Sequence, residues 1–277
     1  MDLVRVSNET LAAFRATVLE YYQAHGRDSL PWRVPEPDGW FDPYKIAVSE
    51  CMLQQTQVSR VVPKFTEFIA RFPSFTALAG AELGAVLQTW SGLGYNRRAK
   101  FLWQVARIIV QEYDGRLPDT AAELTRLPGI GPNTAGALLA YAYNKPVVFI
   151  ETNIRTVFIY HFLSDRQAID DKVILDLVAS VLPADSRSWY WALMDYGTHL
   201  KQAIGNLNTL SKHYTRQSAF QGSKRQIRGQ VLKALGARPG TLQELRQTIT
   251  DERLAGVLDD LTNEGLIQHR DELFILG

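Results

Sequence analysis

The sequence has a single cysteine, Cys51, among its 277 residues. One cysteine cannot form an internal disulfide, and it cannot supply the several thiolates that an iron–sulfur cluster requires. We therefore expect no iron–sulfur cofactor, and a reducing compartment such as the cytoplasm. Cys51 itself is interpreted as a small side chain packed in the core.

Long apolar runs are also missing. No stretch approaches the roughly 20 residues that a membrane-spanning helix needs, so we expect no membrane partner. Apolar residues make up 46% of the chain and charged residues 21%, which is ordinary for a globular protein. A length of 277 residues suits two or three structural units, and we expect a monomer.

Acidic residues are missing from one long segment, because none occurs between Asp195 and Glu244. The segment holds eight basic residues, which are Lys201, Lys212, Arg216, Lys224, Arg225, Arg228, Lys233 and Arg238. A run of like charge is commonly a solvated face, but eight cations without an acidic neighbour favour contact with a polyanion.

Helical periodicity dominates the chain. Apolar residues recur at helical spacing from Leu11 to Tyr21, before a stop at Gly26. Further helices are predicted over residues 44–55, 58–71, 80–89, 96–113, 120–126, 132–143, 152–163, 170–181 and 187–203. Residues 147–150 could form a strand, but in so helical a chain we interpret them as a buried connector. The predicted fold class is all-α.

The composition changes near residue 205. Residues 205–223 are polar and basic, and we predict a linker there. Residues 224–277 contain three amphipathic helical stretches and then two short apolar stretches, which is the outline of a winged helix. Winged helices bind DNA or dock proteins, and the acidic third helix, beginning at Asp251, favours docking. Residues 1–204 are predicted to form a separate helical core.

One motif joins two predicted helices, because residues 127–136 read LPGIGPNTAG. A G-x-G turn before a helix lets main-chain N–H groups approach a phosphate, although it could also be only a tight turn. The motif resembles the hairpin of the helix-hairpin-helix DNA glycosylases, the superfamily of endonuclease III and MutY. That resemblance implies a structural monovalent cation and an anchored DNA phosphate. The residues concerned are Leu127, Gly129 and Ile130 for the cation, and Gly129, Gly131 and Thr134 for the phosphate.

Three further stretches resemble the MutY-type adenine glycosylases. They are DPYKIAVSECMLQQTQV at residues 42–58, LPWR at 30–33 and WSGLGY at 90–95. The matches follow the family's order and spacing, and together they cover roughly residues 9–203. The resemblance implies a two-lobed helix-hairpin-helix core that binds double-stranded DNA, flips out a mispaired or damaged base and cuts its N-glycosidic bond.

Cutting that bond calls for an acid that protonates the leaving base and an anion that stabilises the cationic sugar. Glu50 lies among apolar residues, and burial raises a carboxyl pKa into the range of a general acid. It could instead be an exposed glutamate on an amphipathic helix, but the resemblance implies that it is the catalytic acid. The second carboxylate is predicted at Glu151, where the family has Asp. Glu151 could also be only a charge near the start of a helix.

Other site residues follow from the resemblance. Asn133 stands where the endonuclease III branch carries its Schiff-base lysine, and because Asn has no amine we expect a monofunctional enzyme. The predicted base pocket consists of Trp32, Arg33, Leu53, Asn133 and Trp191. Gln55 is implied to enter the duplex when a base is flipped, and Tyr95 to stack beside the opposing base. A polar helix end and a core aromatic are the alternatives for these two residues.

Besides Glu151, the chain departs from the MutY pattern in three further respects. A basic stretch replaces the family's cluster loop, and a winged-helix-like module stands in place of its Nudix-like domain. Trp191 occupies the position of a polar residue that helps the family to read adenine, and an indole cannot present the same acceptor. The predicted phosphate contacts are Arg97, Arg98, Lys212, Arg216, Lys224 and Arg225.

The predicted function is excision of a mispaired base, with adenine opposite 8-oxoguanine or guanine first. Two alternatives stay open. One is an enzyme that removes uracil or thymine mispaired with guanine. The other is a catalytically weak protein that binds lesions without turnover.

Overall fold

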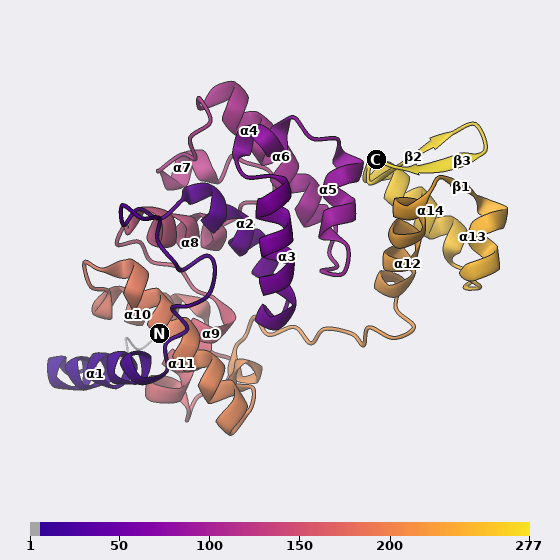
Figure 1. Ribbon diagram of the computed structural model, residues 1–277. Coiled ribbons are helices and arrows are strands. Elements are labelled where there is room, and N and C mark those ends of the chain that lie inside the picture. The colour runs from indigo at the N-terminus through magenta and orange to yellow at the C-terminus, as the bar shows by residue number, and fades with distance from the viewer. Residues whose placement is uncertain (1–5) are drawn as a thin grey trace. The chain divides into compact units, whose positions relative to one another are not determined.

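The computed structural model describes residues 6–277 (Figure 1). These residues form two compact units. The first comprises the chain up to Ile46, Asp119–Thr125 and Ile130–Arg216, and the second comprises Ala47–Pro118, Arg126–Gly129 and Gln217–Gly277. The prediction of an all-α fold is confirmed, since the only sheet within residues 6–277 is a small one near the C-terminus.

The first unit is built around α11 (Ser186–Ile204). The helices α1 (Asn8–His25), α8 (Pro132–Tyr143) and α9 (Thr152–Phe158) all contact it. The remaining elements are α7 (Ala121–Leu124), the π-helical turn η1 (Ile159–Leu163), α10 (Asp171–Val181) and the 3-10 turn η2 (Leu207–Leu210). Large side chains fill the core, and those of Trp189, Tyr190, Phe149 and Phe158 are almost completely buried. Burial of such apolar surface is what holds these short helices together.

The second unit contains most of α2 (Pro43–Leu53), which begins in the first unit. Four further helices follow in the chain, which are α3 (Val58–Arg71), α4 (Phe75–Ala79), α5 (Leu83–Trp90) and α6 (Arg97–Glu112). α4 and α5 pack on α6, and α3 contacts α5. The buried side chains of α6 recur at helical spacing, as Leu102, Val105 and Ile109 do.

The C-terminal part of the second unit has three helices and three short strands. They are α12 (Lys224–Ala237), β1 (Gly240–Thr241), α13 (Leu242–Thr248), α14 (Leu254–Asn263), β2 (Ile267–Arg270) and β3 (Leu273–Leu276). The strands pair antiparallel in the order β1-β3-β2, with Ile267 opposite Leu276 and Arg270 opposite Leu273. Figure 1 shows the β2–β3 hairpin in yellow beside α14. The helices and hairpin expected from the sequence are present, and β1 is an additional strand.

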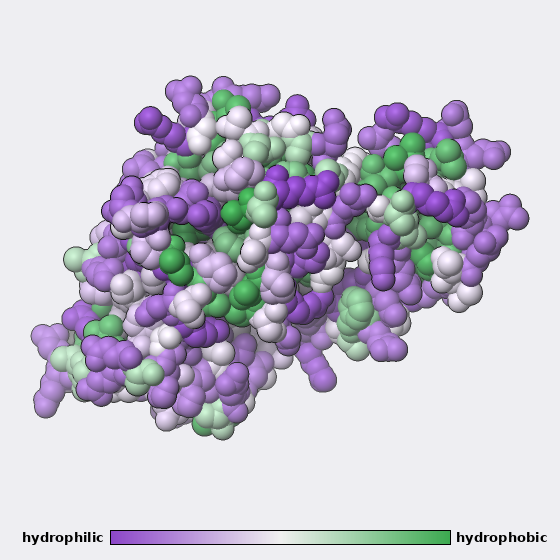
Figure 2. All heavy atoms as spheres, in the orientation of Figure 1, coloured by the Kyte–Doolittle hydropathy of each residue, from purple (hydrophilic) through white to green (hydrophobic). Residues whose placement is uncertain are grey.

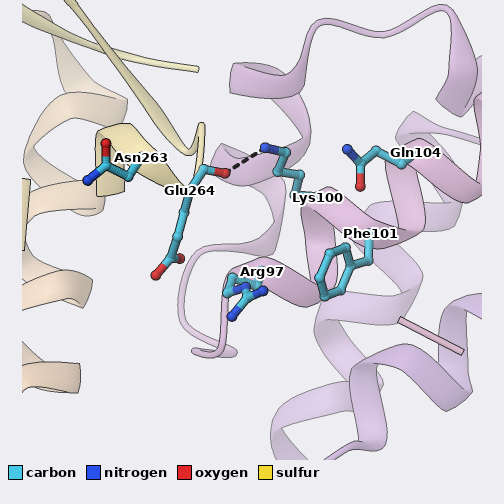
Figure 3. A pocket seen from close by; sticks show the side chains of 6 residues that line it. All are labelled: Arg97, Lys100, Phe101, Gln104, Asn263 and Glu264. Atoms are coloured by element: carbon cyan, nitrogen blue, oxygen red, sulfur yellow. Dashed lines mark hydrogen bonds between the residues drawn. The ribbon is translucent and has the colours of Figure 1, made fainter. Parts of the chain in front are cut away.

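Side chains of α5 and α6 bind the C-terminal ends of two of these helices. Lys100 on α6 donates a hydrogen bond to the main-chain oxygen of Glu264 at 2.5 Å, just after α14. Gln88 on α5 donates to the main-chain oxygen of Gly236, in the last turn of α12, also at 2.5 Å. The last carbonyls of a helix have no partner within it, so these two donors satisfy groups that would otherwise need water. Lys100 also lines a cavity of about 300 Å³ between α6 and the end of α14 (Figure 3).

Several helix limits differ from the predicted ones. The helix predicted over residues 80–89 begins only at Leu83, as α5. A separate short helix, α4, precedes it, because Ser74 caps α4 by accepting a hydrogen bond from the N–H of Ala77. The predicted helix over residues 152–163 is α-helical only to Phe158 and ends in the π-helical turn. α14 begins at Leu254 rather than at Asp251, because a turn precedes it, in which the N–H of Leu254 donates to the main-chain oxygen of Asp251.

The predicted connector over residues 147–150 has no regular structure, and its buried part is limited to Phe149 and Ile150. On the face drawn in Figure 2, polar side chains predominate and apolar ones form small, separate groups. Within residues 6–277, no helix combines the length and the apolar character needed to cross a membrane.

Candidate active site

Glu50 lies in the last turn and a half of α2, on a helix with little polar surface. Its neighbours Val48, Ser49 and Met52 are buried, and Glu50 itself is half-buried. Burial also raises the pKa of the adjacent Cys51 thiol to about 12. Cys51 is therefore a neutral packing residue, and Glu50 stays the predicted catalytic acid of this helix.

Arg98, on α6, holds the C-terminal end of α2. Its Nη1 donates hydrogen bonds to the main-chain oxygens of Cys51, Met52 and Gln54 at 2.7, 2.9 and 2.6 Å. These carbonyls have no partner inside the helix, and a guanidinium supplies several donors in a rigid plane. Its positive charge also suits the negative end of the helix dipole. Arg98 therefore fixes the end of the helix that carries Glu50.

The prediction that Arg98 touches DNA phosphates is wrong for this structure. Its side chain is buried, and Nη2 is engaged by the main-chain oxygen of Gly94 and the hydroxyl of Thr56. Arg97, the preceding residue, is exposed, with its guanidinium carbon 5.3 Å from the centre of the Phe101 ring. Arg97 therefore stays a predicted phosphate contact, whereas Arg98 has a structural role.

Gln55 and Tyr95 share an uncommon backbone conformation. Their φ angles are 55° and 47°, in the left-handed region that residues other than glycine rarely adopt. Both side chains are exposed on the second unit. Such conformations persist only where the surroundings impose them, and they gather at functional sites. The two residues are therefore accessible to a duplex, and their insertion into DNA stays a prediction.

The hairpin motif has the glycine geometry that the sequence predicts. Gly129 has a φ of +75°, and a Cβ atom there would lie 2.6 Å from the ring of Phe101. Gly131 is the N-cap residue of α8 and is exposed, with no atom within 4 Å of the place where a Cβ would stand. Thr134, in the first turn of α8, is half-buried. The arrangement suits a phosphate at the N–H groups of α8, and both phosphate and cation binding stay predictions.

Asn133 lies in the first turn of α8. Its Oδ1 accepts a hydrogen bond from the main-chain N–H of Ile150 at 3.4 Å. The amide thus ties the start of α8 to the residue that precedes Glu151. Asn133 offers no amine for an imine, so the structural role that it has here is compatible with the predicted monofunctional chemistry.

Glu151 is the N-cap residue of α9, with φ −127° and ψ 169°, yet its side chain makes no capping hydrogen bond. The side chain is half-buried, and burial raises the pKa of its carboxyl group from 4.5 to about 7. A glutamate that served only to start a helix would bind the free N–H groups and keep a low pKa. The alternative of a simple helix-end charge is therefore disfavoured.

A close contact with α11 fixes the start of α9. A Cβ atom at Gly197 would lie 2.4 Å from the main-chain oxygen of Asn153, so only glycine fits there. The Asn153 side chain donates to the hydroxyl of Thr198 at 3.2 Å. The carboxyl group of Glu151 is thus carried by a helix whose first turn is packed against α11.

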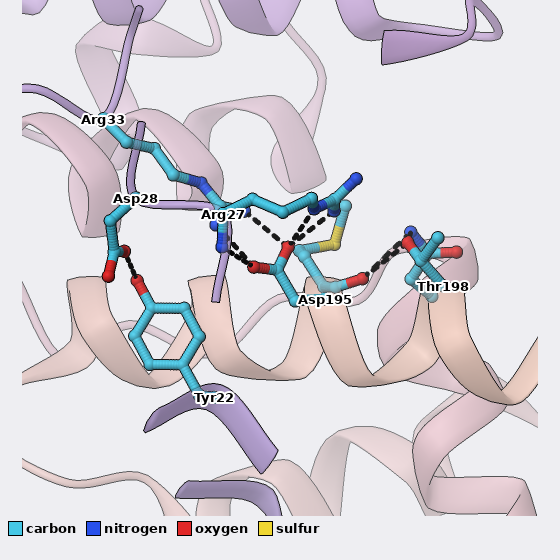
Figure 4. Close-up of polar contacts among 8 residues, drawn as sticks. Tyr22, Arg27, Asp28, Arg33, Asp195 and Thr198 are labelled. Atoms are coloured by element: carbon cyan, nitrogen blue, oxygen red, sulfur yellow. Dashed lines mark hydrogen bonds and ion pairs between the residues drawn. The ribbon is translucent and has the colours of Figure 1, made fainter. Parts of the chain in front are cut away.

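An ion-pair network around Asp195 on α11 was not predicted from the sequence (Figure 4). Arg27 donates to its carboxylate through the main-chain N–H and through Nε, both at 2.8 Å, and Arg33 through Nη1 at 2.8 Å and Nη2 at 3.0 Å. Burial alone would raise the pKa of Asp195, but the hydrogen bonds and charges of Arg33 and Arg27 outweigh it and lower that pKa. The sequence feature that could have indicated this network is the acidic residue Asp195 within the aromatic run of α11.

Among the predicted pocket residues, Trp32 and Arg33 are buried, and Leu53, the last residue of α2, is half-buried. The guanidinium carbon of Arg33 lies 5.2 Å from the centre of the Trp191 ring, and Tyr141 stacks on the same ring at 6.0 Å. Trp191 is only 7% exposed. Its indole is therefore packed in the interior of the first unit, and Asp195 holds Arg33 against it.

The basic stretch is less free of countercharge than its sequence indicates. Four of its cations form ion pairs, which are Lys212 with Asp170, Lys224 with Asp260, Arg228 with Glu264 and Arg238 with Glu244. Two of the acidic partners lie on α14 or at its end. Arg216 and Arg225 are therefore the better remaining candidates for phosphate contacts.

Residues 48–181 match the family model of the HhH-GPD superfamily of base excision DNA repair proteins. An adenine DNA glycosylase of Mycolicibacterium smegmatis is 37% identical over 235 residues, which cover 79% of this chain and 78% of that protein. The chain belongs to the HhH-GPD superfamily.

One further relative and one solved structure are also similar to this chain. An adenine DNA glycosylase of Buchnera aphidicola subsp. Baizongia pistaciae is 35% identical over 220 residues, which cover 76% of this chain. The chain spans about three fifths of the length of that relative, at 61%. A solved thermostable thymine-DNA glycosylase superposes with a TM-score of 0.59 at 24% identity, over 69% of this chain and 87% of that one. The fold predicted from the hairpin motif is thereby confirmed.

Proposed function

We propose that this HhH-GPD protein is a monofunctional DNA N-glycosylase that removes adenine mispaired with 8-oxoguanine or guanine. Its relatives from Mycolicibacterium and Buchnera are adenine DNA glycosylases. The observation that carries the proposal is Glu151, a half-buried carboxyl group at a helix start that it does not cap. A buried carboxyl group weakens a fold unless it is paired, so its presence here points to chemistry.

Glu50 is the proposed general acid. Protonation of a ring nitrogen turns the base into a neutral leaving group as the bond to the sugar lengthens. The acid must hold its position relative to the base, and the hydrogen bonds from Arg98 to Cys51 and Met52 restrain the helix turn that carries Glu50. Pre-organised geometry of this kind is what makes a single carboxyl group effective.

Glu151 is the proposed electrostatic partner. The sugar becomes positively charged as the base departs, and a nearby carboxylate stabilises that charge. A pKa of about 7 leaves the group partly protonated near neutrality in the free protein. A developing cation favours the ionised form, so Glu151 would stabilise the transition state more than the ground state. Water then completes the hydrolysis and leaves an abasic site.

Double-stranded DNA with a mispaired base is the proposed partner, and the protein is proposed to act as a monomer without an iron–sulfur cofactor. The proposed contacts are Gln55, Tyr95, Arg97, Gly129, Gly131, Thr134, Lys212, Arg216, Lys224 and Arg225. Main-chain oxygens of the hairpin would hold a monovalent cation, whose part is structural. Asn133 cannot form an imine, so the phosphodiester backbone stays intact after base release.

Trp191 favours a second candidate substrate. The buried indole, packed by Tyr141 and Arg33, offers no acceptor to the amino group of adenine. Removal of thymine or uracil opposite guanine is the alternative that needs no such acceptor. A protein that binds mispairs without turnover is the remaining alternative.

A panel of duplexes tests these candidates together. Equal amounts of duplex with A·8-oxoguanine, A·G, T·G, U·G or a paired A·T at one position are incubated with excess protein and treated with alkali, which cleaves abasic sites. We expect cleavage of the first two only. Cleavage of T·G and U·G alone would support the second candidate. Retention of mispaired duplex without any alkali-sensitive product would refute the enzymatic proposals.

A further inference from the structure

One short segment, residues 217–225, holds the two side chains that are proposed to enter the duplex, Gln55 and Tyr95. Nε2 of Gln217 donates a hydrogen bond to Oε1 of Gln55 at 3.0 Å. Nη1 of Arg225 donates to the hydroxyl of Tyr95 at 2.7 Å, and its guanidinium carbon lies 5.7 Å from the centre of the tyrosine ring. Both pairs lie within the second unit and join residues more than a hundred positions apart.

The same segment also has an internal hydrogen bond. Nη2 of Arg225 donates to the main-chain oxygen of Ser218 at 2.6 Å, and Ser218 follows Gln217 directly. One guanidinium therefore joins the tyrosine to the part of the segment that reaches Gln55. Residues 217–222 contain no helix or strand, so side-chain hydrogen bonds contribute much of what holds this segment in place.

Restraint matters at Gln55 and Tyr95 because their side chains are long and exposed. Such a side chain samples several rotamers in water and loses that freedom when it enters a duplex. A side chain that is already held loses less, so the free energy of binding is more favourable. The left-handed backbone at both positions fixes the direction in which each side chain leaves the main chain. The hydrogen bonds from the segment restrain the polar end of each side chain.

We infer that Gln217 and Arg225 are positioning residues, which hold Gln55 and Tyr95 in the conformation that enters DNA at a mispaired base. The inference rests on the proposed function. It makes a different prediction from a plain phosphate contact by Arg225. A phosphate contact strengthens binding to every duplex alike, whereas positioning strengthens binding only where a base is displaced and its place is filled.

Three variants separate the two roles. Gln217→Ala removes one contact without changing charge. Arg225→Lys keeps the charge, but one ammonium group cannot reproduce the planar fork that binds Tyr95 and Ser218 together. Arg216→Ala is the matched control, because Arg216 is an exposed cation of the same stretch with no ion pair in the described structure.

Dissociation constants are measured for an A·8-oxoguanine duplex and for the fully paired duplex of the same sequence. We expect Gln217→Ala and Arg225→Lys each to weaken mispair binding by about five- to tenfold, with paired-duplex binding unchanged. Arg216→Ala should weaken both duplexes by the same factor. If Arg225→Lys and Gln217→Ala each lost the same factor of affinity for both duplexes, the positioning role would be overturned.

Hydrogen exchange of the free protein supplies a readout that needs no enzymatic activity. We expect faster exchange at residues 54–57 and 93–97 in Gln217→Ala and Arg225→Lys, and wild-type exchange in Arg216→Ala. Unchanged exchange in the first two variants would contradict the inference. If the wild-type protein released no base from any duplex, the proposed function would fail, and the exchange experiment would still decide whether the segment holds the two residues.

Discussion

The guanidinium of Arg98 lies 2.7 Å from the main-chain oxygen of Cys51, the residue next to Glu50. Arg98 was predicted from the sequence to contact DNA, but in the structure it holds the end of the helix that carries the proposed catalytic acid. The helix α2 ends there because its last carbonyls are bound by a side chain of α6 and not by a further helical turn. The position of Glu50 therefore depends on residue 98.

Arg98→Lys tests that dependence. Lysine keeps the charge but loses the planar fork, and it leaves several buried carbonyls without a donor. We expect the free energy of unfolding to fall by about 2–4 kcal/mol, since each unsatisfied buried group costs about 1–3 kcal/mol. Urea denaturation measures the change. Arg97→Lys, on the same helix but exposed, is the matched control and should change stability by less than about 0.5 kcal/mol. Equal stability of the two variants would refute the support role.

The raised pKa of Glu151 predicts how stability depends on pH. Its carboxyl pKa is about 7 in the folded protein and 4.5 in the unfolded chain. The folded state therefore keeps a proton that the unfolded state releases, so stability falls as the pH rises from about 4.5 to about 7. Glu151→Gln removes that penalty. The variant should equal the wild type near pH 4.5 and exceed it by up to about 3 kcal/mol at pH 8. Denaturation curves at both pH values check this, and a less stable variant at pH 8 would contradict it.

The same group predicts how activity depends on pH. If Glu151 acts as an anion, its contribution to the rate of base release should rise with pH and level off above about 7, while the general acid Glu50 must stay protonated. Glu151→Gln should lose this rise together with nearly all activity, and Glu151→Asp should retain activity because it keeps the charge. Single-turnover rates between pH 5 and pH 9 provide the measurement. Normal turnover by the Gln variant would refute the two-carboxylate mechanism.

Removing single charges from the basic stretch should change the salt dependence of DNA binding by unequal amounts. Arg216 is free of ion pairs in the described structure, whereas Lys224 is paired with Asp260. A free cation that binds phosphate releases about one counterion, and a neutralised one releases less. Arg216→Ala should lower the slope of log Kd against the logarithm of the salt concentration by about 1, and Lys224→Ala should lower it by clearly less. Equal slopes for the two variants would show that the ion pair opens on DNA.

The sequence alone predicted most of the helices, because helical periodicity is a local pattern. The apolar spacing of α8 and the glycines before it predict a helix over residues 132–143, and the structure has those limits. Contacts between distant residues carry no such pattern. The acidic partner of Arg228 is Glu264, 36 positions later, so the stretch looks unpaired in sequence. The bonds from Arg98 to α2 span more than forty positions, and that distance hid its structural role.

The monofunctional assignment has its own test. Asn133 accepts a hydrogen bond from the N–H of Ile150 and has no amine. We expect no strand cleavage without alkali, and no covalent protein–DNA adduct after borohydride treatment, under conditions in which alkali reveals abasic sites. A trapped adduct would show that a lysine elsewhere forms an imine with the sugar.

The central claim is that Glu50 donates the proton that releases the base. Its most direct test is the single-turnover release of adenine from an A·8-oxoguanine duplex, with saturating protein, by the wild type and by Glu50→Gln. An amide cannot deliver the proton, so the variant should be slower by at least about a hundredfold, while its Kd for the duplex stays within about threefold of the wild type. Release by Glu50→Gln at the wild-type rate would contradict the account.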